Sequence, residues 1–76
     1  MNKPRRKALN EIYDQLQALK DELEAINEEE IEYRDNIPEN MQGGERYEKV
    51  ENACDNLDSA LCSIQEALDY IESATE

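Results

Sequence analysis

The fold is decided by residues 35–44, Asp35-Asn36-Ile37-Pro38-Glu39-Asn40-Met41-Gln42-Gly43-Gly44, which separate two long stretches rich in helix-forming residues. Pro38 disfavours helical geometry at the residue before it, so a helix entering this segment should end near Asn36. Gly43 and Gly44 offer free backbone torsions, and Gly44 is a candidate N-cap for the next helix. The segment predicts a loop over residues 36–44 between helices over about 5–35 and 45–74.

Apolar residues on both sides of this loop recur at alternating spacings of three and four. The first stretch carries Leu9, Ile12, Leu16, Leu19, Leu23 and Ile26. The second stretch carries Tyr47, Val50, Cys54, Leu57, Leu61, Ile64, Leu68 and Ile71. Heptad patterns of this length are typical of coiled coils and helix bundles. The sequence therefore predicts an all-α fold with residues 1–76 as a single domain.

The two patterns also match one another in register. In an antiparallel pair of helices, residues that face each other have numbers with a constant sum. Ile12 and Leu68 sum to 80, as do Leu19 with Leu61 and Ile26 with Cys54. The sequence thus predicts an antiparallel two-helix hairpin in which both apolar columns of the first helix face the second.

An additional alanine column suggests that one hairpin is not the complete assembly. Its members, spaced by seven, are Ala53, Ala60, Ala67 and Ala74. Alanine is the best helix former, which is one explanation of the column. The interpretation that we favour is that the column faces a second hairpin in a homodimeric four-helix bundle, with Ala8 and Tyr13 of the first helix as flanking candidates for the same contact. Helices donated by a different protein would satisfy the same physical requirement.

The charge distribution excludes several ligands. The chain has 8 basic and 20 acidic residues, a net charge of −12, which argues against direct binding to nucleic acid or to an anionic membrane. The second helix should carry an outer row of carboxylates, here called the acidic strip: Glu48, Glu51, Asp55, Asp58, Asp69 and Glu72. This strip is either a solvated surface or a mimic of a nucleic-acid backbone that competes for a basic groove.

Two loop residues, Ile37 and Met41, are apolar within otherwise polar surroundings. They either plug the end of the hairpin or form an exposed contact for a protein partner.

Catalytic, cofactor-binding and metal-binding motifs are not apparent. The chain has no His, no phosphate-binding glycine loop and no GxSxG motif, so we expect neither an enzyme nor a cofactor or metal site. Cys54 and Cys62 would lie about 12 Å apart on one helix, too far for a disulfide between them. Unpaired thiols, no long apolar run and no signal peptide favour a cytoplasmic location.

The loop string from Tyr33 to Gln42, followed by Glu45-Arg46-Tyr47-Glu48, resembles a recurring element of small acidic proteins from Firmicutes bacteria, their phages and other mobile elements. The resemblance implies a helical hairpin and no particular activity. The sequence as a whole predicts a non-enzymatic protein-interaction module. The alternative is a nucleic-acid mimic that inhibits a DNA- or RNA-binding protein.

Overall fold

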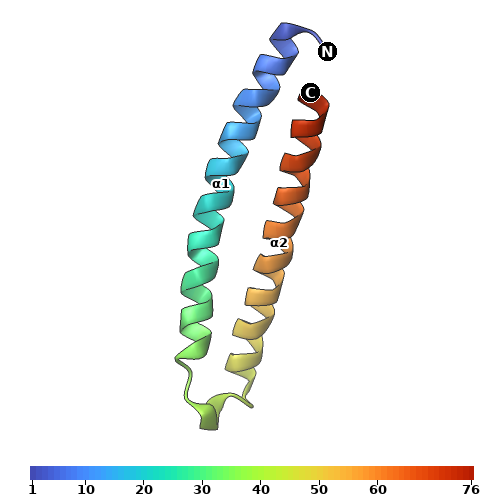
Figure 1. Ribbon diagram of the computed structural model, residues 1–76. Coiled ribbons are helices and arrows are strands. Elements are labelled where there is room, and N and C mark those ends of the chain that lie inside the picture. The colour runs from blue at the N-terminus through green and yellow to red at the C-terminus, as the bar shows by residue number, and fades with distance from the viewer.

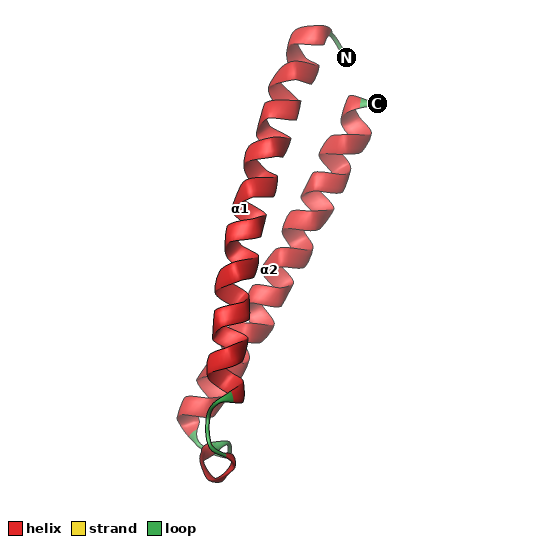
Figure 2. Cartoon of the chain, turned by 60° about the vertical axis from the view of Figure 1, so that its left-hand side comes forward, coloured by secondary structure: helices red, strands yellow, loops and turns green.

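The computed structural model describes all 76 residues as a hairpin of two long helices. Helix α1 spans Lys3–Asp35, helix α2 spans Glu45–Thr75, and a short 3-10 turn, η1, spans Glu39–Met41. The two helices run antiparallel, and both termini lie at the end opposite the loop (Figure 1; Figure 2). The predicted all-α helical hairpin is confirmed, and each helix ends within two residues of the expected position.

Local sequence signals explain where α1 begins and ends. The side chain of Asn2 accepts a hydrogen bond of 2.9 Å from the backbone N–H of Arg5, and Pro4 lies in the first turn, where its missing N–H costs nothing. At the other end, the N–H of Asn36 still donates to the carbonyl of Glu32 at 3.1 Å. Pro38 follows two residues later, so the helix ends as the sequence predicts.

The two glycines before α2 do not adopt the unusual backbone torsions that glycine permits. Gly44 is the N-cap of α2, but its φ is −84°, and neither glycine has a positive φ. A Cβ atom at Gly44 would lie 3.3 Å from the carbonyl oxygen of Met41, whereas one at Gly43 would meet nothing. Glycine at position 44 is therefore explained by a close backbone approach and not by an unusual torsion.

The loop end contains the best-buried apolar cluster. Ile37, only 7% exposed, packs with Val50 and Cys54, and Ile31 and Tyr47 cover the cluster from the two helices. The side-chain amide of Gln42 donates to the carbonyl of Ile37 and closes the loop over it. Ile37 is thus a plug for the end of the hairpin.

The rotation of α1 corrects the predicted interface between the helices. Ile12, Leu19 and Ile26 are 50%, 57% and 53% exposed, so the prediction that they pack against the second helix of the same chain is wrong. Next to the half-buried leucine column Leu9, Leu16 and Leu23, α1 instead turns a different column toward α2. That column consists of Tyr13, Lys20, Asn27 and Arg34, and all of its members are buried or half-buried.

Geometry limits how many columns of α1 can enter the interface. A two-helix interface accommodates about two heptad columns from each helix, so only one neighbour of the leucine column can enter it. The column that enters can bury the long aliphatic stem of Lys20 and form an interhelical hydrogen bond through Asn27. Interhelical polar contacts join Asn27 to Asp58 and Tyr33 to Arg46, with residue sums of 85 and 79 that bracket the predicted 80.

The resulting molecule is a narrow rod with Cα extents of 59 × 15 × 13 Å. Neither helix contains a stretch that is long and apolar enough to cross a lipid bilayer.

Candidate protein-interaction surface

One contact near the loop shows which columns of the two helices share a side of the hairpin. Arg46 of α2 donates from Nε to the hydroxyl of Tyr33 of α1 at 2.8 Å, and its guanidinium carbon lies 5.3 Å from the centre of the tyrosine ring. Residues seven apart lie on the same face of a helix. Tyr33 therefore marks the α1 face of Ile12, Leu19 and Ile26. By the same spacing, Arg46 marks the α2 face of the alanine column.

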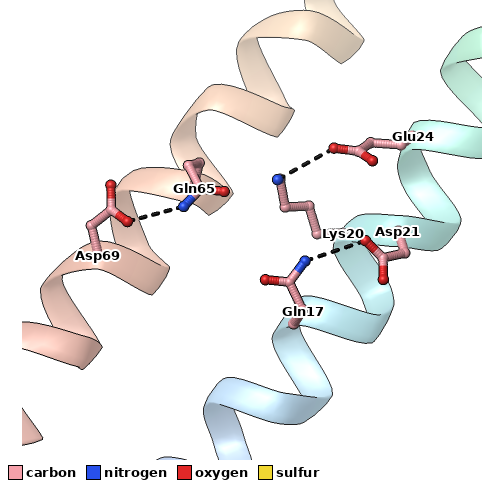
Figure 3. A network of polar contacts seen from close by, with 6 residues as sticks. All are labelled: Gln17, Lys20, Asp21, Glu24, Gln65 and Asp69. Atoms are coloured by element: carbon pink, nitrogen blue, oxygen red, sulfur yellow. Dashed lines mark hydrogen bonds and ion pairs between the residues drawn. The ribbon is translucent and has the colours of Figure 1, made fainter.

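The opposite side of the hairpin is polar. Asn27 donates from Nδ2 to Asp58 across the interface at 2.8 Å. Further along the rod, Figure 3 shows Gln17 and Lys20 on α1 facing Gln65 on α2. Each of these three side chains contacts an acidic residue four positions further along its own helix, at distances of 2.9–3.3 Å. Polar side chains thus line this side along much of its length.

The remaining side has one largely apolar column from each helix, and we call these two columns together the apolar face. It consists of Ile12, Leu19, Ile26 and Tyr33 from α1 and Ala53, Ala60, Ala67 and Ala74 from α2. Three large aliphatic side chains at a spacing of seven are half exposed on it. Bulky residues on one helix beside small residues on the other form a shallow surface that suits the packing of further helices.

The structure places the whole alanine column of the predicted dimer interface on the apolar face. Ala53, Ala60 and Ala67 are half-buried and Ala74 is exposed. Tyr13 belongs to the same α1 column as Asn27, so it lies toward the polar side and does not share a face with the alanines. The predicted role of Tyr13 beside the alanine column is therefore wrong. The column of Ile12 could not be identified as a surface from the sequence, because its spacing equally fits the interior of a hairpin.

The two loop residues separate into different environments. Met41 is 48% exposed at the tip of the hairpin, whereas Ile37 is buried in the plug. An exposed partner contact thus remains available to Met41 only. For Ile37 the plug alternative holds and the exposed contact does not, because α2 covers its side chain.

The acidic strip lies away from the apolar face. All six of its carboxylates are exposed, and Asp58 on the strip bonds to Asn27 on the polar side. Charge and apolar surface are therefore segregated on opposite sides of α2, and covering the apolar face would leave the strip in solvent.

The two cysteines are free and differ in environment. Cys54 is buried in the plug, and desolvation raises the pKa of its thiol. Cys62 is exposed. Close to the plug, a hydrogen bond of 3.2 Å to Asp35 raises the pKa of the Arg34 guanidinium, which stays charged.

Comparison with protein-family models, with curated proteins and with solved structures found no match to this chain. The resemblance of the Tyr33–Glu48 region to small proteins of Firmicutes and their phages therefore stays a prediction.

Proposed function

We propose that this protein is a non-enzymatic interaction module whose hairpins dimerise through the apolar face into a four-helix bundle. The observation that carries the proposal is the column of Ile12, Leu19 and Ile26, half exposed and joined to the alanine column on one side of the rod. A contiguous exposed apolar surface with a polar surround is typical of a protein-binding site.

The placement of the apolar residues supports a bundle. In a four-helix bundle, each helix contacts two neighbours and directs its apolar residues toward the common centre. One hairpin taken from such a bundle therefore has its apolar residues displaced to one side of the line between its helices. The rotation of α1 produces this displacement.

The size of the surface supports a second copy as the occupant. One whole side of the rod measures 59 × 15 Å between Cα atoms, a projected area of about 900 Å², which is enough to contain the roughly 800 Å² that each partner contributes to a typical stable interface. A second hairpin has the same length and presents the same alternation of large and small residues. Each copy can therefore place its aliphatic column against the complementary face of the other.

Ala60→Glu and Leu19→Glu test the proposal, with Ser59→Glu as the matched control on the exposed outer side of α2. Light scattering at micromolar concentration should give twice 8.8 kDa for the native chain and for the control. Both variants on the apolar face should give the monomer mass, because dimerisation would force the new carboxylate into an apolar interface. Circular dichroism should show that the Leu19→Glu chain stays helical. A native chain that is monomeric would refute the dimer.

The acidic strip supports the second candidate, mimicry of a nucleic-acid backbone. Its six carboxylates remain exposed along α2 and would stay accessible in the dimer. A basic partner captured from cell extract should then be released steeply as salt rises. A partner held by Met41 should instead resist salt and be lost on Met41→Ser. For both candidate functions we place the protein in a reducing, cytoplasmic compartment, which the two free cysteines support.

A further inference from the structure

Two twofold arrangements can bring two apolar faces together, and they differ in where the loops lie. With the twofold axis along the rod, both loops lie at the same end and α1 packs beside α2 of the partner. With the axis across the rod, the loops lie at opposite ends and each helix packs beside its own copy. Both arrangements keep neighbouring helices antiparallel, so helix polarity does not choose between them.

The outer flank of the apolar face on α1 is acidic. The next column outward from Ile12 consists of Ala8, Gln15, Glu22 and Glu29, all of them exposed. This column contains two carboxylates and no cation. Packing α1 beside a second α1 would therefore bring two acidic flanks together, and like charges across an interface are unfavourable.

The corresponding flank of α2 contains no carboxylate. It consists of Lys49, Asn56, Ser63 and Tyr70, all exposed, and Tyr70 is 77% exposed. Three of these side chains are neutral hydrogen-bond donors and the fourth is a cation. This flank can therefore accept the acidic flank of α1 without repulsion.

The register of the hairpin aligns the two flanks. When both loops lie at the same end, α1 and the partner's α2 stand at the same height as α1 and α2 within one chain. The interhelical contacts Tyr33–Arg46 and Asn27–Asp58 have sums of 79 and 85. These sums place Glu22 between Asn56 and Ser63 of the partner, and Glu29 between Lys49 and Asn56. Each carboxylate thus faces a side chain that can donate a hydrogen bond.

We propose that the second copy covers the apolar face with its loop at the same end, so that α1 of each chain packs beside α2 of the other. This inference rests on the proposed dimer. It implies that the two exposed Met41 side chains lie at the same end of the bundle.

The distance between the two loops tests the arrangement directly. A spin label at Glu39→Cys, in a Cys62→Ser chain whose remaining thiol is buried, reports that distance by pulsed electron spin resonance. Helices in a bundle lie about 10 Å apart, so loops at one end should give label distances below about 30 Å. Loops at opposite ends should give distances near or above the 59 Å length of the rod.

Ser63→Lys tests the flanks without a label. With the loops at one end, the new cation faces Glu22 of the partner and should strengthen dimerisation about fivefold at low salt. With the loops at opposite ends, the two new cations face the partner's α2 and should weaken it. Ser59→Lys adds the same charge on the outer side of α2 and is the matched control.

The failure of this arrangement can be distinguished from the failure of the proposed function. A dimer with long or mixed loop distances, or one weakened by Ser63→Lys, overturns the arrangement and leaves the proposed function standing. A native chain that stays monomeric overturns both.

Discussion

Replacing Leu19 with alanine distinguishes a hairpin that is complete by itself from one that needs a partner. Truncation of a fully buried leucine to alanine costs about 2–5 kcal/mol. Leu19 is 57% exposed within one chain, so the hairpin alone should lose only about 1–2 kcal/mol of its free energy of unfolding. If a second copy covers Leu19, the loss should rise toward the roughly 2–5 kcal/mol of a fully buried leucine.

Urea unfolding followed by circular dichroism at two protein concentrations measures the free energy lost on Leu19→Ala and shows whether stability depends on dimerisation. A native dimer should become more stable at the higher concentration, by about 2.7 kcal/mol per dimer, or about 1.4 kcal/mol per chain, for a hundredfold increase. Leu68, 0% exposed inside the hairpin, is the matched control, because Leu68→Ala should cost about 2–5 kcal/mol whether or not a partner is present.

Two outcomes would refute the reasoning. A small loss on Leu19→Ala, together with native stability that does not depend on concentration, would show that nothing covers the apolar face. A loss as large as that of Leu68→Ala, again without concentration dependence, would show that the hairpin itself buries Leu19 and that α1 is not rotated as described.

Three further predictions concern the interior and the thiols. Because burial raises the pKa of Cys54, the unfolded chain loses this proton at lower pH than the folded chain, so the free energy of unfolding should fall as pH rises above 9.0. Urea titrations at several pH values should show a shallower fall for Cys54→Ala, whereas Cys62→Ser should retain it. A thiol reagent should modify Cys62 rapidly and Cys54 only on unfolding; two fast thiols would contradict the plug. Asn27→Leu should raise the free energy of unfolding by about 1 kcal/mol, because Asn27 Oδ1 is buried without a hydrogen-bond partner and the exposed Asp58 can be hydrated instead. A loss of stability in thermal or urea unfolding would show that the Asn27–Asp58 bond outweighs this cost.

The parts of the fold that depend on local chemistry could be predicted from the sequence. Pro38 ends α1 through a clash with the residue before it, and heptad spacing identifies which residues of each helix share a column. An apolar residue in a polar loop, such as Ile37, allows either a plug or a contact. Only the three-dimensional position of α2 over the loop decides between them.

The rotation of α1 could not be predicted in the same way. The columns of Ile12 and Tyr13 both border the column of Leu9, and either can complete a two-helix interface. The outcome depends on side chains of α2, such as Asp58, that lie far away in sequence and come close only in the folded hairpin. The candidate surface follows from this choice, because the column excluded from the hairpin is the one left exposed.

The position of the two termini has a practical consequence for any chain fused to this one. Both ends leave the rod together, with most of its 59 Å length between them and the loop (Figure 1). The hairpin can therefore act as a stalk: grafted into a surface turn of a carrier protein, it would hold Met41 far out in solution. Immobilised by a tag at either terminus, it would present the same tip to whatever flows past.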